Sequence, residues 1–394
     1  MASSKDYALI TVLFLAEFSR GAFFLAFLPL YTTEFFGWTV ATAGLAASVH
    51  YFAETLVKSF AGWQLDRFGR PVLLAGLVVG LAALVMARIY SHPVSLVAFS
   101  GLFGLGFSPL WIGVFTEVAP TDKKDRSSRI GLVFAAWLAG MGSGLAAINF
   151  FISVSYDFAF LVIILFFLAA LIIAWLFYPS VSNNQPGPGI SPAPILPAIR
   201  HLAVNKAVSR VLLPTMFLQT LSGSLLIPVL PVFARTSLGL SHDGYGLLVI
   251  AGGLAMVLFL IPMGRLADKT NLKTILFAGM ALASAALSGL ALAGNKDNAV
   301  IISLILGISY AAVLPAWNTL LAKAVPPERQ ATGWGIFSTV EGLGIAVGPA
   351  MGGVLARYFN PVGTLLAAAG ILSLMALFYL VYPVERFFKT GVRG

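Results

Sequence analysis

Six ionisable side chains lie in segments that are otherwise apolar enough to cross a membrane. They are Glu17, Arg20, His50, Glu54, Lys58 and Glu341. An ionisable group deep in a membrane helix costs at least about 2.5 to 3.5 kcal/mol on insertion scales, so its presence indicates a functional site. Burial of a carboxyl group favours the protonated acid, whereas a neighbouring guanidinium favours the carboxylate. An acid that can lose its arginine partner is therefore suited to proton coupling.

The spacing of these residues places them in two polar stripes. Glu17 and Arg20 lie three residues apart in the first apolar segment, and His50, Glu54 and Lys58 recur every four residues in the second. With both termini inside, Glu17 lies ~14 Å and Glu54 ~12 Å from the inner face. The equal depth predicts one polar pocket. A purely structural ion pair beside a neutral Glu54 is the alternative, and for His50 a packing or hydrogen-bonding role is the alternative to carrying a proton.

The elements that carry these stripes must be membrane-spanning helices. The chain of 394 residues is 59% hydrophobic and only 10% charged, which excludes a single soluble core. Twelve apolar segments of about 20 residues follow one another, the length that crosses a bilayer as a helix. They span 8–30, 39–62, 71–90, 94–118, 129–154, 157–178, 209–233, 243–264, 273–294, 299–323, 330–356 and 361–383. Because they are continuously apolar, they predict helices and not a β-barrel.

The net charge of +9 is explained by membrane orientation, not by a nucleic-acid partner. With both termini in the cytoplasm, Arg20 lies within the bilayer, Arg88, Arg235, Lys296 and Arg357 lie outside, and the remaining 19 of 24 Lys and Arg lie inside. The chain has no cysteine, and its first apolar segment lacks a small-residue cleavage site, so we expect that segment to be retained as a helix.

A proline-rich segment divides the chain into two halves. "YPSVSNNQPGPGISPAPILPAIR" carries six prolines between Pro179 and Pro197, which excludes regular helix or strand. We therefore expect a six-helix bundle over 1–178, a cytoplasmic linker over 179–208 and a second six-helix bundle over 209–394. A shift of 202 positions aligns Pro29, Gly37, Gly44, Gly62 and Asp66 with Pro231, Gly239, Gly246, Gly264 and Asp268. An even number of helices per half predicts a parallel repeat.

The same shift shows that the polar stripe exists in one half only. The positions that match its five residues are Gln219, Ser222, Gly252, Met256 and Leu260. If the homologous helices line one cavity, the cavity is charged on the N-terminal side and apolar on the C-terminal side, which suits an amphiphilic ligand. Glu341 interrupts the apolar side and is a candidate second titrating group in the cavity. Trp111, Trp137 and Trp317 lie deep in their segments, where lining the cavity and simple packing remain equally open.

The loop after the second segment resembles a motif of the major facilitator superfamily. "GWQLDRFGRPVLL" matches Gly-x-Leu-x-Asp-Arg-x-Gly-Arg, and "GRLADKTNLKTIL" repeats it in the second half with Asp268. The residues of this candidate gating loop are Gly62, Asp66, Arg67, Gly69, Arg70 and Asp268. We expect Gly62 to let two helix ends approach, and Gly69 to adopt a left-handed conformation. Asn271, at the place that matches Gly69, is the next-best residue for that conformation.

Two motifs of the superfamily's drug exporters are displaced or missing. "GLGIAVGPAMGG" in the eleventh segment is similar to the antiporter motif, which in the superfamily belongs to the fifth helix. The fifth segment has Gly140, Gly142 and Gly144 but no matching proline, and the fourth lacks a buried arginine. Both departures weaken the prediction of an ordinary drug pump.

Several stretches resemble one branch, the glycolipid flippases that serve lipoteichoic acid assembly in Gram-positive bacteria. They include "LFLAEFSRG", "SVHYFAE", "SPLWI", "LPAWNTLLA" and "WGIFSTVEGLGIAVGPAMGG". The resemblance implies that Glu17, Arg20 and Glu54 form the proton-coupled pocket and that Trp111 and Trp137 lie near the sugar head. His50, Trp317, Asn318 and Glu341 complete the candidate substrate-binding residues. The family usually has Asp in place of Glu54 and an uncharged residue in place of Glu341.

The sequence thus predicts an all-α protein with twelve transmembrane helices in two pseudo-symmetric bundles. We expect a multi-pass plasma-membrane antiporter, probed here as a monomer, that flips an amphiphilic glycolipid such as diglucosyl diacylglycerol by alternating access. The proton gradient drives it, with no cofactor and no metal. A proton-driven multidrug exporter is the alternative in the same superfamily. A membrane enzyme or a sensor is disfavoured because the sequence has no Gly-x-Ser-x-Gly, His-Glu-x-x-His or Walker motif and no soluble domain.

Overall fold

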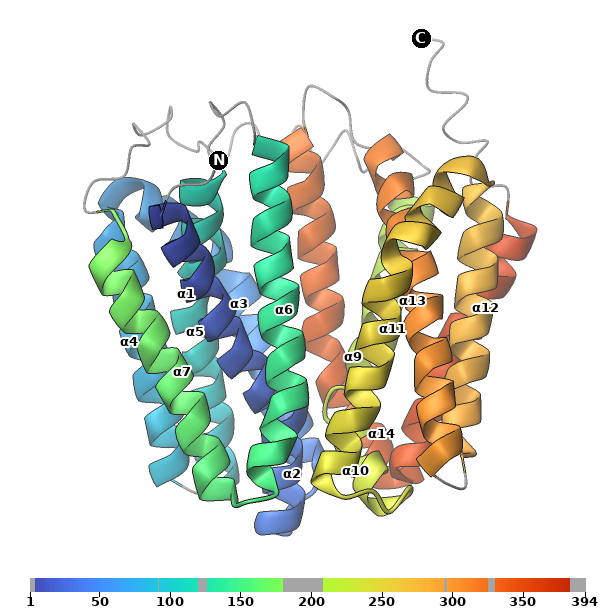
Figure 1. Ribbon diagram of the computed structural model, residues 1–394, viewed down its shortest axis with the longest axis horizontal. Coiled ribbons are helices and arrows are strands. Elements are labelled where there is room, and N and C mark those ends of the chain that lie inside the picture. The colour runs from blue at the N-terminus through green and yellow to red at the C-terminus, as the bar shows by residue number, and fades with distance from the viewer. Residues whose placement is uncertain are drawn as a thin grey trace. The chain divides into compact units, whose positions relative to one another are not determined.

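The computed structural model describes residues 4–90, 92–119, 126–179, 208–293, 296–324 and 330–382. In these residues every regular element is a helix (Figure 1). The chain divides into two compact units, Met1–Ser191 and Pro192–Gly394. Most of the proline-rich linker expected from the sequence, 180–207, lies outside the described residues.

The N-terminal unit contains six membrane-length helices. The first of them begins as α1 and continues without interruption through two wide π-helical turns. The elements are α1 Ser4–Ala22, η1 Phe23–Phe27, α2 Leu28–Leu30, η2 Tyr31–Phe35, α3 Val40–Phe68, α4 Arg70–Ile89, α5 Pro93–Val118, α6 Arg126–Ile152 and α7 Tyr156–Phe177. In the figures α1 to α7 run from blue to green (Figure 1).

The C-terminal unit repeats this plan with two irregular places. Its elements are η3 Val208–Leu212, α9 Leu213–Leu225, α10 Leu230–Thr236, α11 His242–Lys269, α12 Leu272–Ala291, α13 Lys296–Ala324 and α14 Gln330–Val381. A turn over 226–229 separates α9 from α10 where the sequence predicts one continuous helix. Pro228 lies in that turn and Pro231 follows it, and proline cannot donate the backbone hydrogen bond that a helix interior needs.

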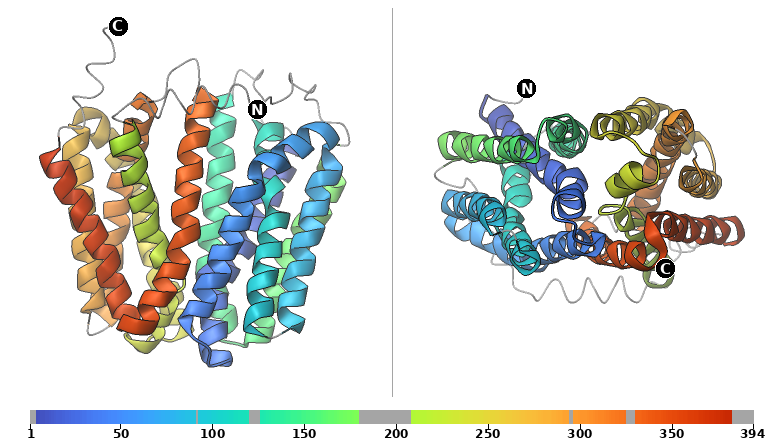
Figure 2. Two further views of the ribbon diagram at one scale, coloured as in Figure 1. Left: turned by 180° about the vertical axis from the view of Figure 1, so that it is seen from behind. Right: turned by 90° about the horizontal axis from the view of Figure 1, so that it is seen from below.

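The predicted number of twelve crossings is confirmed. Ten stretches are long and apolar enough to span a bilayer. One of these, Thr339–Val381, contains two helices, because α14 breaks at Phe359 and Asn360. Its two arms meet there and the chain reverses direction (Figure 2). The twelfth crossing is α3, which has 29 residues and is therefore long enough, although His50 and Glu54 lower its hydropathy.

Local sequence explains several of the helix boundaries. Gly37 and Gly239, which the 202-residue repeat aligns, both have positive φ, at 67° and 63°, so the repeat is visible in the backbone as well as in the sequence. Gly69 separates α3 from α4 with a φ of 63°, as expected. The expectation for Asn271 is wrong: its φ is −64°, and its side chain instead accepts a hydrogen bond from the Lys273 backbone N–H as the N-cap of α12.

Glycines bring α1 and α6 into backbone contact inside the N-terminal unit. A Cβ atom added to Gly140 would lie 2.5 Å from the Phe14 carbonyl oxygen and 3.0 Å from the Glu17 Cβ. Gly21 and Gly144 are equally close to backbone atoms of the opposite helix. Small residues permit such close packing in membranes, where lipid tails are as apolar as the side chains. This packing fixes the position of the α1 segment that carries the charges.

Candidate functional site

The candidate site is a three-residue ionic bridge between α1 and α3. Arg20 Nη2 lies 2.9 Å from Glu17 Oε1 and 2.7 Å from Glu17 Oε2. Arg20 Nη1 donates a hydrogen bond of 2.9 Å to Glu54 Oε2. The structure thus brings together the three residues for which the sequence predicts equal depth. We call this set the ionic bridge.

All three members of the ionic bridge are buried within the N-terminal unit. Their exposed fractions are 1% for Glu17, 6% for Arg20 and 7% for Glu54. Removal of such charges from water is costly, and only close pairing offsets the cost. One guanidinium here serves two carboxylates, so neither acid can gain a proton or move without changing what the arginine holds.

Aromatic rings complete the environment of the arginine. The Arg20 guanidinium lies 4.5 Å from the centre of the Phe107 ring on α5 and 5.8 Å from that of Tyr51 on α3. A guanidinium over an aromatic face is stabilised by the negative charge of the ring face. Neither aromatic residue was among the predicted site residues, because both lie in apolar runs where an aromatic side chain is ordinary.

The rest of the α3 stripe surrounds Glu54 at longer range. Lys58 Nζ lies 3.6 Å from Glu54 Oε1, and its side chain is 41% exposed. His50 Nε2 lies 3.9 Å from Glu54 Oε2. His50 itself is fully buried, with Nδ1 3.3 Å from the Ser100 carbonyl oxygen on α5. That environment agrees with the packing or hydrogen-bonding role weighed for His50.

Trp111 on α5 and Trp137 on α6 form an aromatic group near each other. Their ring centres are 5.9 Å apart at 72°, and Phe115 and Phe134 extend the group. Both tryptophans are partly exposed, and Phe134 is 44% exposed. The group therefore presents accessible aromatic surface on the same unit as the ionic bridge.

The predicted site residues of the C-terminal unit do not form a comparable cluster. Asn318 on α13 and Glu341 on α14 are exposed. Ser222, which matches Arg20 in the repeat, is buried and donates a hydrogen bond to the Ala368 carbonyl oxygen. The charged site thus belongs to the N-terminal unit, as the one-sided stripe predicts.

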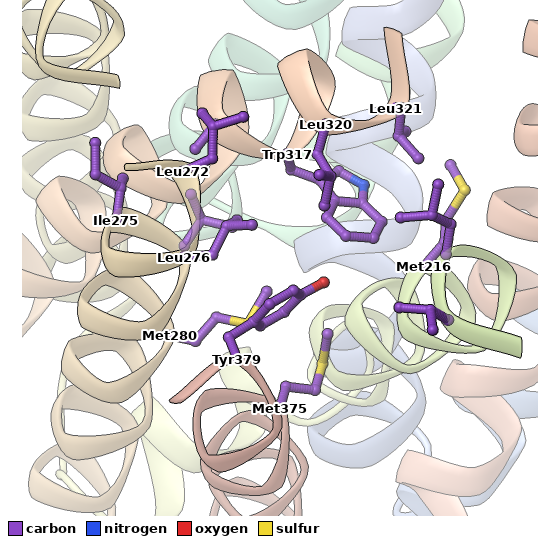
Figure 3. Close-up of a cluster of buried hydrophobic side chains, with 14 of the residues drawn as sticks. Met216, Leu272, Ile275, Leu276, Met280, Trp317, Leu320, Leu321, Met375 and Tyr379 are labelled. Atoms are coloured by element: carbon purple, nitrogen blue, oxygen red, sulfur yellow. The ribbon is translucent and has the colours of Figure 1, made fainter. Parts of the chain in front are cut away.

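Trp317 lies in the hydrophobic core of the C-terminal unit. It is 4% exposed and packs among Met216, Leu320 and Tyr379 (Figure 3). Its ring centre is 6.5 Å from that of Tyr379. Of the two roles that the sequence leaves open, this environment favours packing over contact with a ligand, because aliphatic and aromatic side chains surround the indole.

The candidate gating loop is only partly described, since the side chains of Asp66 and Asp268 lie outside the described residues. Arg67 is exposed and lies 5.6 Å from the Trp63 ring centre, and Arg70 donates to the Trp175 carbonyl oxygen. The expectation for Gly62 is wrong in one respect. A Cβ atom there would make only ordinary contacts with Ile112 at 3.5 and 3.9 Å, so close helix approach does not require this glycine.

Comparison with known proteins agrees with this architecture. A bacterial homologue of the lysosomal transporter Spinster, inward-facing and unoccupied, superimposes with a TM-score of 0.78 at 16% identity, over 98% of this chain and 97% of that one. The nucleoside transporter NupG gives a TM-score of 0.77 at 15% identity, over 96% and 99% of the two chains. At these identities the likeness concerns the fold alone. It is the fold of a polytopic membrane transporter.

The sequence relatives define the family. The Major Facilitator Superfamily profile matches residues 9–217 and 212–394, so the chain belongs to this superfamily. A Staphylococcus haemolyticus protein named proton-coupled antiporter flippase LtaA is 28% identical over 393 residues, covering 97% of this chain and 95% of the relative. The Staphylococcus aureus protein of the same name is 27% identical, covering 97% and 96%. The matched proteins are transporters by name, in agreement with a transporter and not an enzyme.

Proposed function

We propose that this protein is a proton-coupled antiporter that flips a glycolipid such as diglucosyl diacylglycerol across the plasma membrane for lipoteichoic acid assembly. The observation that carries the proposal is the buried ionic bridge between α1 and α3. The staphylococcal relatives support it, because they are named proton-coupled antiporter flippases and match nearly the whole chain. Protons and a membrane lipid are then the partners.

The ionic bridge supplies a physical basis for coupling. Arg20 holds the Glu54 carboxylate on α3 while it also holds Glu17 on its own helix. A proton on Glu54 removes the negative charge that attracts Arg20, and the link between α1 and α3 is lost. Arg20 then keeps Glu17 alone. Proton binding and the contact between the two helices thus exclude each other, which is the relation that an antiporter needs.

The aromatic group on α5 and α6 is the proposed contact for the sugar head. Trp111 and Trp137 offer partly exposed ring faces, and flat aromatic faces pack against the C–H faces of sugar rings. We keep Asn318 and Glu341 as proposed contacts because both are exposed on the C-terminal unit. The loop after α3, with Arg67 and Arg70, remains the proposed gating loop.

The orientation and assembly state are part of the proposal. Placing both termini in the cytoplasm leaves 19 of the 24 Lys and Arg on the inner side, which the positive-inside rule favours. We propose a monomer, because each unit holds its own helices and the ionic bridge is complete within one chain.

The test is transport in liposomes that contain the purified protein. Movement of a labelled glycolipid between leaflets is followed with and without an imposed pH gradient, and we expect the gradient to accelerate it. Glu17→Gln and Glu54→Gln should abolish the gradient-driven part, while Glu34→Gln, whose carboxyl group binds Tyr156 at an exposed site, should not. Unchanged transport in both pocket variants would refute the proposal. Dye extrusion without lipid movement would favour a multidrug exporter instead.

A further inference from the structure

The imidazole ring of His50 is held in one orientation. It is fully buried. Its ring centre lies 4.2 Å from that of Phe24, 5.0 Å from Phe103 and 6.1 Å from Phe107. The opposite helix is also close, since a Cβ atom added to Gly104 would lie 2.9 Å from the His50 carbonyl carbon. A ring packed in this way cannot turn over without moving α5 or α1.

The hydrogen-bond partner of the ring assigns its tautomer. Nδ1 lies 3.3 Å from the Ser100 carbonyl oxygen, and a carbonyl oxygen can only accept. Nδ1 therefore carries the hydrogen. In the neutral ring the lone pair is then on Nε2, which has no hydrogen-bond partner among the described residues. A buried acceptor left unused in this way costs free energy, so a state in which it is used is favoured.

The atom that Nε2 faces is the one that Arg20 holds. Glu54 Oε2 accepts from Arg20 Nη1 at 2.9 Å and lies 3.9 Å from His50 Nε2. A hydrogen bond from a carboxylic acid to a ring nitrogen needs a separation of about 2.6 to 3.2 Å. A shift of about 1 Å by one carboxyl group, easily made by a glutamate side chain, thus moves Oε2 from one partner to the other.

We propose that His50 is a positioning residue that accepts a hydrogen bond from the protonated Glu54 carboxyl group once Arg20 has released it. The step is balanced: Glu54 takes one proton from water, its Oε2–H donates to His50 Nε2, and Arg20 retains Glu17. The proton stays on Glu54, and His50 remains neutral. This inference deepens the proposed function and rests on it only where it gives the protonation a part in transport.

The other charged and titratable groups near Glu54 are consistent with this exchange. From α1 they are Glu17 and Arg20, and on α3 itself they are Tyr51 and Lys58. From α5 the printed contacts to His50 are the Ser100 carbonyl oxygen and aromatic rings. Of these groups, only the neutral His50 ring presents a lone pair to Glu54 from inside the packed core, where a proton donor needs an acceptor.

Two isosteric substitutions separate the two ring nitrogens. In His50→Asn the amide nitrogen reaches the place of Nδ1, so the bond to Ser100 is kept and the acceptor at Nε2 is lost. In His50→Gln the side-chain amide reaches the place of Nε2 and can offer its oxygen to Glu54. Protonation of Glu54 is followed against pH by infrared difference spectroscopy of the full-length protein in lipid nanodiscs. The Glu54→Gln variant identifies the signal of the protonated Glu54.

We expect half-protonation of Glu54 at a pH about 0.5 to 1 unit lower in His50→Asn than in the unmodified protein, because one hydrogen bond to the protonated acid is lost. His50→Gln should stay close to the unmodified protein. Equal shifts in both variants, no shift in His50→Asn, or no protonated Glu54 signal at any pH would overturn the inference. Since no transport is measured, a failure of the proposed flippase activity in liposomes is recorded separately.

A measurement that leaves His50 unchanged covers the case in which His50→Asn does not fold. The chain has only four histidines, so replacement of His92, His201 and His242 by Gln leaves His50 as the single histidine. Nitrogen NMR of this protein with labelled histidine distinguishes the two neutral tautomers. We expect the hydrogen on Nδ1 and a bare Nε2 at neutral pH. A hydrogen on Nε2 would overturn the inference.

Discussion

Removal of Arg20 alone should destabilise the protein more than removal of all three charges of the ionic bridge. In Arg20→Met the side-chain volume is nearly kept, but Glu17 and Glu54 lose the cation that contacts them at 2.7 and 2.9 Å. Both carboxyl groups are less than 10% exposed. Lys58 reaches only Glu54, at 3.6 Å. The variant therefore leaves Glu17 buried beside a second acid without a close cation.

The magnitude follows from what is left behind. Removal of one partner of a buried ion pair destabilises a protein by about 3 to 5 kcal/mol, because the other charge remains buried. Replacement of a whole buried ionic cluster by neutral groups of similar size is instead often neutral or stabilising. We therefore expect Glu17→Gln with Arg20→Met and Glu54→Gln to recover most of the stability that Arg20→Met loses.

The measurement is unfolding in mixed micelles, followed by the fluorescence of the seven tryptophans. None of them contacts the ionic bridge in the interactions described above, so their signal reports unfolding of the units. The free energy of unfolding is compared among the unmodified protein, Arg20→Met and the triple variant. A loss below about 1 kcal/mol in Arg20→Met, or a triple variant no more stable than Arg20→Met, would refute the reasoning.

Three further predictions concern packing, backbone and substrate. Gly144→Ala should destabilise the protein, because its Cβ would meet the α1 backbone, whereas Gly142→Ala, with no atom within 4 Å, should not; equal melting temperatures would contradict this. Gly69→Ala should lose about 1 to 3 kcal/mol of unfolding free energy, because the residue has a φ of 63°. Trp137→Ala should weaken discrimination between lipid head groups in the liposome assay, and Trp175→Ala, 59% exposed on α7, should leave it intact. Loss of discrimination in both tryptophan variants would argue against a specific sugar contact.

The helices could be predicted from the sequence because lipid imposes a length and a composition on each of them. The predicted break between 356 and 361 lies beside the observed break at Phe359 and Asn360. The wide turns at η1 and η2 could not be predicted, since Phe23–Phe27 is as apolar as its neighbours and carries no distinguishing residue. Their cause is the packing of α1 against other helices, which one segment does not record.

Part of the site could also be predicted. Charges are rare in membrane helices, so Glu17, Arg20 and Glu54 stood out, and the known rise of a helix gave them a common depth. Aromatic residues are common there, so the sequence could not separate Trp137, which is partly exposed, from Trp317, which is buried in a core. That difference depends on which helix faces which, and this follows from tertiary packing and not from the type of residue.

The glycine contacts between α1 and α6 have a mechanical consequence. From Phe14 to Ala22 the two helices touch through backbone atoms, with no layer of deformable side chains between them. A displacement of α1 is therefore transmitted to α6 without slack, as along a stiff lever. Arg20 lies on one arm of this lever and Trp137 on the other, so an ionic event on α1 moves the aromatic surface proposed to hold the sugar. Charge and cargo are thus connected by rigid backbone contact, not by a chain of polar groups.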